Sequence, residues 1–162
     1  MQDIALRDIK IGDAGWLIQR HAECYAAAEQ FDASFELLVA DIVVDFLRNR
    51  DLTCERAWIA ESGDARLGSI FCVRGARPRQ AKLRLFFLEP TARGRGLGRR
   101  LLETCLAYAR DKGYAQMTLS THASHTAACA LYAKSGFTLE ARRPVRAFGV
   151  DLEEQDWVLS LR

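Results

Sequence analysis

The amino-acid sequence predicts a single α/β domain built on a mixed β-sheet. Segments with strand-like and helix-like residue patterns follow one another in the order β-α-α-β-β-β-α-β-α-β-β, which packs most naturally as one sheet with helices against it. The chain has 162 residues, enough for one sizeable hydrophobic core and too few for two ordinary domains. No repeat, low-complexity segment or linker divides it. We therefore expect one domain over residues 1–162.

The N-terminal third is expected to form one strand and two helices. Residues 3–9 alternate as a first strand does, and Gly12-Asp13 supplies a turn and a helix N-cap. A first helix is expected from Ala14 to about Gln30. A second helix would be capped by Ser34. Its apolar residues recur at intervals of three and four along the sequence: Phe35, Leu38, Val39, Ile42, Val43 and Phe46.

A hairpin, a strand and a helix follow in the middle of the chain. Segments 56–62 and 65–75 flank a turn at Gly63-Asp64, and the polar loop 76–80 leads to a further strand that ends at Leu88, before Pro90. A helix over about 98–112 would stop at Gly113, which suits the residue after a helix C-cap. The remaining expected elements are a strand over 114–121, a helix over 124–134 that ends before Gly136, and strands over 137–145 and 156–162.

The composition excludes several classes of protein. A net charge of +2 gives the chain no general attraction for nucleic acid. No apolar run approaches the roughly 20 residues of a membrane span, and the N-terminus is acidic where a signal peptide is basic and then apolar. We expect a cytoplasmic protein that binds neither membrane nor nucleic acid. Five widely spaced cysteines without a CxxC pair are expected to be reduced structural thiols: Cys24, Cys54, Cys72, Cys105 and Cys129.

Three alternating glycines between a strand and a helix indicate a phosphate site. Gly94, Gly96 and Gly98 follow the strand that ends at Leu88 and come directly before the predicted helix. The first N–H groups of a helix have no internal partner, and the helix dipole adds about half a positive charge there. Glycine lets the backbone approach a ligand closely. Four arginines surround the turn: Arg93, Arg95, Arg99 and Arg100.

The common nucleotide loops fit this segment poorly. A Walker loop needs a lysine after its last glycine, whereas Arg99 follows Gly98. A dinucleotide fingerprint, G-x-G-x-x-G, would need a third glycine at position 99, where this chain has Arg99. That fingerprint also follows the first strand of a parallel sheet, whereas these glycines follow a later strand. The glycines could also only shape a strand–helix turn, with no ligand.

Two segments resemble the GCN5-related N-acetyltransferase (GNAT) family. Residues 93–98 fit its (Gln/Arg)-x-x-Gly-x-(Gly/Ala) signature, and residues 128–137, ACALYAKSGF, resemble its helix A-x-x-L-Y-x-x-x-G-F. The order of elements also matches, which implies a GNAT-like mixed sheet of about seven strands flanked by four helices. Details in the N-terminal part and at Arg99-Arg100 and Phe148-Gly149 are similar to the acetyltransferase half of MarR–GNAT fusion proteins, without room for a DNA-binding module before Met1.

The resemblance implies that acetyl-CoA (coenzyme A) is the donor and lies in a V-shaped opening between the fourth and fifth strands. The backbone of Phe86, Phe87 and Leu88 would contact the pantetheine, and N–H groups from Gly94 to Arg99 would hold the pyrophosphate. Many relatives carry Asn where this chain has His125, which could make the same cofactor contact. The implied cofactor-binding residues are Phe86, Phe87, Leu88, Arg93, Gly94, Arg95, Gly96, Leu97, Gly98, Arg99 and His125.

The family motif also implies a general acid. Tyr132 occupies its L-Y-x-x-x-G-F position, where the phenol commonly reaches the sulfur of coenzyme A, and a protonated phenol can donate to a departing thiolate. Without the motif, a half-buried tyrosine packing the short helix would be the better interpretation. Cys129 could serve as a nucleophile, but direct attack in a ternary complex is the family's usual route, so a structural thiol is favoured. His122-x-x-His125 lacks the further ligands of a metal site, and we expect no metal.

The general base stays open. The attacking amine must be neutral, and an amine of pKa about 10.4 is mostly protonated at pH 7. The glutamate that serves as general base in some GNAT relatives would fall near Ser120 in this chain, and a serine cannot act as a base by itself. The alternatives are ordered water and five ionisable residues, each of which could also be a solvated surface group: His122, His21, Glu23, Glu29 and Glu36.

The sequence therefore predicts an acyl-CoA-dependent N-acetyltransferase (EC 2.3.1 type) acting on a primary amine. A non-catalytic acyl-CoA-binding sensor or assembly module is the alternative, since the phosphate loop supports both. The acceptor could be a small molecule or a peptide, and a homodimer is compatible with this interpretation. Arg142, Arg143 and Arg146 would suit an acidic acceptor or form a solvated strand edge.

Overall fold

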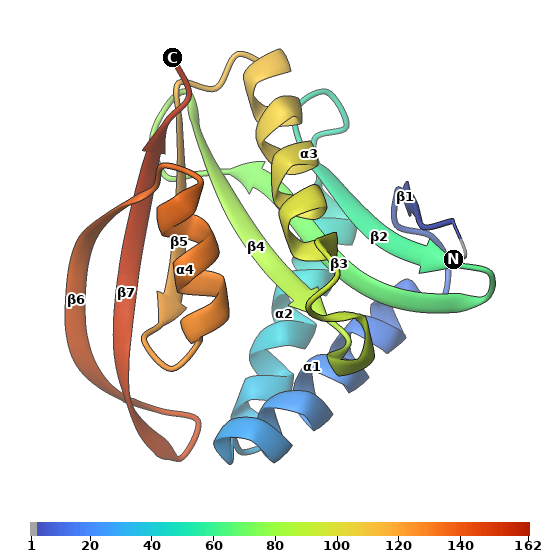
Figure 1. Ribbon diagram of the computed structural model, residues 1–162, viewed down its shortest axis with the longest axis vertical. Coiled ribbons are helices and arrows are strands. Elements are labelled where there is room, and N and C mark those ends of the chain that lie inside the picture. Colours follow the sequence, from blue (N-terminus) through green and yellow to red (C-terminus); the bar gives the residue numbers. More distant parts are fainter. Residues whose placement is uncertain (1–2) are drawn as a thin grey trace.

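The computed structural model describes residues 3–162 and shows one seven-stranded mixed sheet with helices on both faces (Figure 1). The sheet order is β1-β2-β3-β4-β5-β7-β6. All neighbouring strands are antiparallel except β4 and β5, which are parallel. The strands are β1 (Ala5–Arg7), β2 (Arg56–Ser62), β3 (Ala65–Arg74), β4 (Gln80–Leu88), β5 (Gln116–His122), β6 (Thr138–Ala147) and β7 (Val150–Ser160). The predicted GNAT-like sheet with four helices is confirmed.

The four helices divide between the two faces. They are α1 (Asp13–Glu29), α2 (Ala33–Asn49), α3 (Leu97–Asp111) and α4 (Thr126–Lys134), with a short 3₁₀ helix η1 (Pro90–Ala92) before α3. Helices α3 and α4 lie in front of the sheet in Figure 1, and α1 and α2 lie behind it. None of the described helices has the length and apolarity needed to cross a bilayer.

Each face has its own hydrophobic core. Leu101 and Cys105 of α3 pack with Ile70 and Cys72 of the sheet on one side. On the other side, Leu17 of α1 and Val43 of α2 pack with Ile59 and Phe71. Strand residues alternate between the two cores, because successive side chains of a strand point to opposite faces. The five cysteines are free thiols, as expected, and Cys72 and Cys105 are buried in the first core.

The N-terminal helix caps differ from the prediction. Gly12 caps α1 in a left-handed conformation, and Asp13 is its first residue. Asp32, not Ser34, caps α2: its side chain accepts a hydrogen bond from the Ser34 backbone N–H at 3.0 Å. An aspartate two residues earlier satisfies the same free N–H groups, so the sequence allowed either position.

Helix α4 and the last strand also begin at other residues than expected. Helix α4 begins at Thr126 after an N-cap at His125, rather than at Ser124. Strand β7 begins at Val150, not at residue 156, because Phe148 and Gly149 both adopt positive φ (55° and 79°) and form a two-residue hairpin turn. The first residues of β7 are mostly polar, because this part of the hairpin is exposed. They therefore lack the sustained alternation of apolar and polar residues from which a strand is predicted.

Candidate active site

Strands β4 and β5 pair at one end only and leave a V-shaped opening at the other. Their register runs from Gln80↔Gln116 to Lys82↔Thr118 and then stops, although β4 continues to Leu88 and β5 to His122. An extra residue in β4 shifts the β3–β4 register between Ser69 and Phe71, and Leu85 there has φ 47°. Such a bulge bends and twists a strand, which carries β4 away from β5.

Backbone groups of β4 line this opening. The Phe87 carbonyl oxygen faces Gly68 of β3, so the alternating pattern of a strand directs the backbone of Phe86 and Leu88 toward the opening. The Leu88 carbonyl accepts a hydrogen bond from the Arg93 guanidinium at 3.2 Å. The side chain of Phe87 lies on the sheet face that α1 covers, opposite α3, and packs against Trp16 of α1. Of the three predicted backbone contacts, two therefore face the opening.

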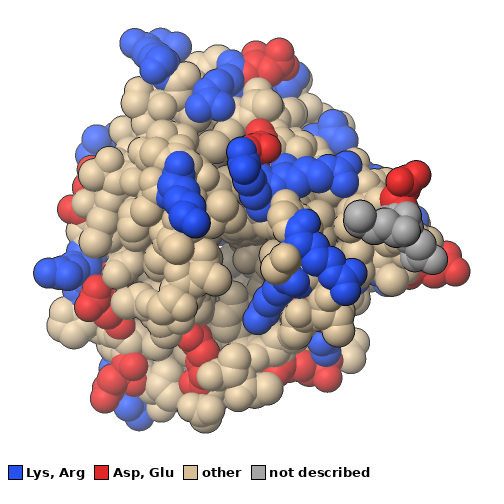
Figure 2. Space-filling model, viewed as in Figure 1, with Lys and Arg blue, Asp and Glu red and all other residues tan. Residues whose placement is uncertain are grey.

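The glycine loop forms an open cradle of N–H donors. Gly94 and Gly96 have φ 78° and 81°, and a Cβ on either would meet no atom within 4 Å. The first helical hydrogen bond is that of Arg100 N–H to the Gly96 carbonyl, and no acceptor within residues 3–162 binds the backbone N–H groups of residues 94–99. Figure 2 shows a hollow in the middle of this face with basic side chains beside it. This is the geometry of an anion site at a helix N-terminus.

Gly98 has a different task from its neighbours. It lies in the first turn of α3, and a Cβ there would approach Leu88 Cδ1 to 3.2 Å and Leu131 of α4 to 3.7 Å. Its lack of a side chain lets α3 pack closely on β4 beside the opening. Sequence pattern alone does not separate a glycine that exposes N–H groups from one that admits a neighbouring strand.

The four arginines of the loop divide between structural contacts and solvent. Arg99 forms an ion pair with Glu103 at 2.7 Å, and Arg100 donates to the Ile4 carbonyl at 2.7 Å. Arg93 is held by Leu88, whereas Arg95 is exposed and has no ion pair among the described residues. These side chains add positive charge next to the N–H cradle, which favours a multiply charged anion.

Tyr132 lies in the wall formed by α4, close to the opening. Its side chain is 4% exposed and packs against the rings of Phe86, Phe137 and Trp157 at 5.6–6.3 Å. Burial, and secondarily the negative charge that ionised Tyr25 would carry, raises the pKa of Tyr132 far above its usual value. The phenol is therefore protonated at neutral pH and can act as a proton donor.

His125 connects α4 to the C-terminal end of α1. Its Nε2 lies 3.0 Å from Glu29 Oε2, and its Nδ1 lies 3.1 Å from the Thr121 hydroxyl. The Tyr25 ring packs on the imidazole at 5.1 Å. Both ring nitrogens are thus hydrogen-bonded within the protein, and a contact from either nitrogen to a cofactor would replace one of these bonds.

An aromatic cluster closes the far end of the opening. Phe31 of the α1–α2 loop and Phe35 of the first turn of α2 pack on Phe148 at the tip of the β6–β7 hairpin, with ring-centroid distances of 4.9 and 5.0 Å. The Asp32 backbone N–H donates to the Phe148 carbonyl at 3.0 Å. His122 packs edge-on against both Phe31 and Phe148. Its Nδ1 is buried and has no hydrogen-bond partner in the part of the chain that the structure describes, and burial lowers its pKa.

The other candidate bases lie in different surroundings. His21 is buried against Phe87, its Nδ1 lies 2.7 Å from the Leu17 carbonyl oxygen, and burial lowers its pKa to about 4. Glu23 pairs with Arg20, and Glu36 is exposed in the first turn of α2. Ser120 donates to Asp156 at 2.8 Å. Among the described residues no group of three or more His, Cys, Asp or Glu side chains has the arrangement of a metal site.

The family assignment rests on a match over most of the chain. Residues 17–137 match the family model described as "Acetyltransferase (GNAT) family", and this range contains the opening, the glycine loop and Tyr132. The chain belongs to the GNAT family.

Curated GNAT relatives match part of the chain. N-acetyltransferase 8B of Rattus norvegicus is 33% identical over 103 residues, which cover 61% of this chain and 45% of the relative. N-acetyltransferase 8 of Homo sapiens is also 33% identical over 103 residues, covering 61% of this chain and 44% of the relative. The chain thus spans less than half the length of these relatives.

Solved GNAT structures share the fold over nearly the whole chain. YncA of Salmonella typhimurium, a putative acetyltransferase solved with its cofactor acetyl-CoA, superposes with a TM-score of 0.75 at 21% identity, covering 98% of this chain and 94% of that one. Spermidine N-acetyltransferase of Vibrio cholerae, solved with CoA and spermine, gives 0.73 at 17% identity, covering 98% and 95%.

Some residues of this GNAT site carry no signal in the sequence. Glu89 follows β4 directly and is held by Arg20 of α1 through two hydrogen bonds of 2.7 and 2.8 Å. Tyr25 reaches His125 from α1, and burial raises its pKa to about 12. Arg20 and Glu89 are 69 positions apart in the chain, and Tyr25 and His125 are 100 positions apart. Only the fold brings the members of each pair together. Amphipathic periodicity could have placed Tyr25 on the inner face of α1, but not beside His125.

Proposed function

We propose that this protein is an acyl-CoA-dependent N-acetyltransferase that transfers acetyl from acetyl-CoA to a primary amine by direct attack in a ternary complex. One observation carries the proposal: β4 and β5 separate after Lys82 and Thr118, directly beside the N–H groups of residues 94–99, which have no acceptor among residues 3–162. A long ligand whose diphosphate is joined to a thioester by a pantetheine arm fits these two neighbouring features. Binding of acetyl-CoA to YncA and of CoA to the spermidine enzyme supports this assignment.

The donor site divides into two parts by chemistry. The N–H groups of residues 94–99 bind the diphosphate, with charge added by Arg93, Arg95 and Arg99. The backbone N–H groups of Phe86 and Leu88 are the donors that face the opening and would hold the pantetheine arm. Acetyl-CoA supplies an activated acyl group as a thioester.

Tyr132 is the proton donor of the proposed reaction. Its high pKa keeps the hydroxyl protonated, and no acceptor among the described residues binds that hydroxyl. A phenol in this position can donate its proton to a leaving thiolate, which is a general-acid role.

Glu29 and His125 form the proposed proton-accepting pair. They are joined at 3.0 Å and lie beside Tyr25. A carboxylate partner stabilises the charged form that an imidazole adopts when it accepts a proton. His122 stays the alternative base, since its Nδ1 has no hydrogen-bond partner among residues 3–162.

The test combines acetyl-CoA binding with turnover. We expect acetyl-CoA at about a hundred times its dissociation constant to stabilise the fold by about 2.7 kcal/mol, and thiol release to appear with at least one member of a panel of small amines, amino acids and peptides. Strong stabilisation without release for any amine would favour the acyl-CoA-binding sensor. A failure of acetyl-CoA to stabilise the protein would refute both functions.

Further expectations extend this proposal. They are a single N-acetyltransferase domain over residues 1–162, a small-molecule or peptide acceptor, a cytoplasmic location, and a closer similarity to the acetyltransferase half of MarR–GNAT fusion proteins. The spermine bound to the Vibrio cholerae enzyme supports an amine acceptor in general.

A further inference from the structure

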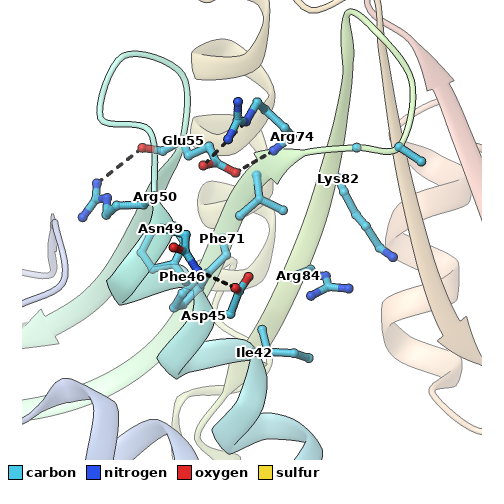
Figure 3. Close-up of a pocket in the computed structure, with 13 residues that line it drawn as sticks. Ile42, Asp45, Phe46, Asn49, Arg50, Glu55, Phe71, Arg74, Lys82 and Arg84 are labelled. Atoms are coloured by element: carbon cyan, nitrogen blue, oxygen red, sulfur yellow. Dashed lines mark hydrogen bonds and ion pairs between the residues drawn. The ribbon is translucent and has the colours of Figure 1, made fainter.

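A cavity on the α2 face of the sheet lies outside the donor site described above (Figure 3). Its volume is about 380 Å³, and it lies between α2, the loop that leads into β2, and the neighbouring strands β3 and β4. Phe46 of α2 and Phe71 of β3 pack edge-to-face at 4.7 Å in its wall, and Ile42 and Val73 extend the apolar surface. The cavity therefore has an apolar wall on the α2 side.

Two cations on β4 form the opposite side of this cavity. Lys82 and Arg84 are separated by one residue, so their side chains share a face of the strand. Figure 3 shows both extending from β4 away from Phe46 and Glu55. Neither forms an ion pair with a carboxylate among residues 3–162.

The carboxylates near these cations are engaged elsewhere. Glu55 accepts from the Arg74 and Asp51 backbone N–H groups at 2.9 and 2.8 Å, and Asp45 accepts from Asn49 at 2.8 Å. Beyond β5, the carboxylates of Asp156 and Glu154 on β7 are both bound by Arg143 of β6. Of the other cations around the cavity, Arg50 pairs with Asp8 and Arg74 with Glu55.

Within residues 3–162, no carboxylate lies at ion-pair distance from Lys82. Burial lowers its pKa, and the charge of Arg84 lowers it further, while Asp156 and Glu154 act weakly in the opposite direction. Two half-buried positive charges side by side repel each other, and an anion between them removes this cost.

The position of the pair links it to the V-shaped opening. Lys82 belongs to the last β4–β5 pair, and Arg84 is the second residue of β4 beyond it, opposite Phe71 of β3. A molecule held at Lys82 and Arg84 on the α2 face thus lies at the point where the opening begins, on the face opposite α3 and its N–H cradle.

We infer that Lys82 and Arg84 bind an anionic group of the acceptor, a carboxylate or a phosphate, so that the substrate class is amines that carry such a group. This inference rests on the proposed acetyl transfer. The guanidinium of Arg84 can bind the anion through two hydrogen bonds, and Lys82 adds a point charge. An apolar part of the acceptor would lie against Ile42 and Val73, which are partly exposed in the cavity wall.

The test compares matched acceptors in the full chain. The ratio of kcat/KM for leucine to that for leucinamide is measured in wild type, Lys82→Gln, Arg84→Gln and the control Arg110→Gln, which removes an exposed cation of α3. O-phosphoethanolamine and ethanolamine form the phosphate pair. We expect Lys82→Gln and Arg84→Gln each to lower the ratio of at least one pair about ten- to hundredfold, with acetyl-CoA affinity retained and Arg110→Gln unchanged. The pair affected identifies the anion.

A binding measurement separates this inference from the proposed function. Succinate or inorganic phosphate is titrated into labelled protein saturated with coenzyme A, and backbone amide shifts at Lys82, Arg84 and Phe71 are followed. Shifts that Lys82→Gln and Arg84→Gln abolish would support the anion site even if no amine were acetylated. Acetyl transfer with unchanged ratios in both variants and no shifts at these residues would overturn it and leave the proposed function standing.

Discussion

At the scale of single residues, burial raises the pKa of Tyr132, the proposed proton donor, and so keeps its phenol protonated. Its ring is enclosed by Phe86, Phe137 and Trp157, so its ionised form is disfavoured and its proton is retained. The sequence motif predicted the role of an acid, and the packing supplies the physical reason why the phenol stays protonated.

Replacement of this hydroxyl tests the role directly. Tyr132→Phe should lower kcat by about 10²- to 10⁴-fold because the leaving thiolate loses its proton donor, while the dissociation constant of acetyl-CoA changes little. Phe137→Leu, which alters a ring that packs on Tyr132, is the packing control. Unchanged turnover in Tyr132→Phe would remove this residue from the mechanism.

At the scale of elements, the two ends of α3 offer a matched pair of glycines. Gly96 caps the N-terminal end with φ 81°, Gly113 follows the C-terminal end with φ 82°, and a Cβ on either would meet no atom within 4 Å. Both positions therefore require the same left-handed backbone conformation, but only Gly96 lies in the proposed diphosphate cradle.

The two alanine variants should separate backbone strain from binding. Gly96→Ala and Gly113→Ala should each lower the free energy of unfolding by about 1–2 kcal/mol, because an L-residue is strained at positive φ. Only Gly96→Ala should weaken acetyl-CoA binding in a calorimetric titration. Equal affinities in the two variants would contradict the placement of the diphosphate at this loop.

A buried carboxylate joins three elements on the other side of the fold. Asp13, the first residue of α1, is 0% exposed and accepts from Arg7 of β1 and Arg66 of β3, each at 2.7 Å. Burial alone would raise its pKa, but hydrogen bonds from Arg7, the Lys10 backbone N–H and Arg66 outweigh burial, so the pKa of Asp13 lies below its usual value.

Removal of this carboxylate should be costly. Asp13→Ala leaves the Arg66 guanidinium without the carboxylate that binds it and leaves Arg7 with Glu61 alone, and we expect a loss of about 3–5 kcal/mol in the free energy of unfolding. Asp111→Ala, at an exposed aspartate of α3, should change stability little. Urea denaturation of both variants measures this difference, and similar midpoints would show that Asp13 is dispensable.

At the scale of the whole molecule, two cores share one sheet, and His21 is buried in the neutral form between α1 and β4. Its pKa is about 4 in the folded chain and 6.5 in the unfolded chain, so the unfolded state binds more protons between these values. The stability that neutral His21 provides is fully present above pH 6.5 and is lost as the pH falls toward 4.

This linkage predicts a pH-dependent stability. Between pH 7 and pH 5 the free energy of unfolding should fall by about 2 kcal/mol from His21 alone. The lowered pKa of His122 acts in the same direction. His21→Leu should remove most of this loss in urea denaturation at the two pH values. An equal loss in wild type and His21→Leu would show that other groups dominate.

The sequence by itself determined the order of elements and the fold family, and it predicted the anion loop at residues 94–99. These depend on local periodicity, on glycine positions and on motifs that lie close together in the chain. Only the tertiary structure decided where β4 parts from β5, that Gly98 serves packing, and that Glu29 meets His125 and Arg20 meets Glu89. Each of these depends on strand register, on a bulge in β4 or on the crossing of distant helices. Such nonlocal packing leaves no pattern in neighbouring residues. For the same reason, only the folded chain could show that Lys82 and Arg84 have no carboxylate partner among residues 3–162.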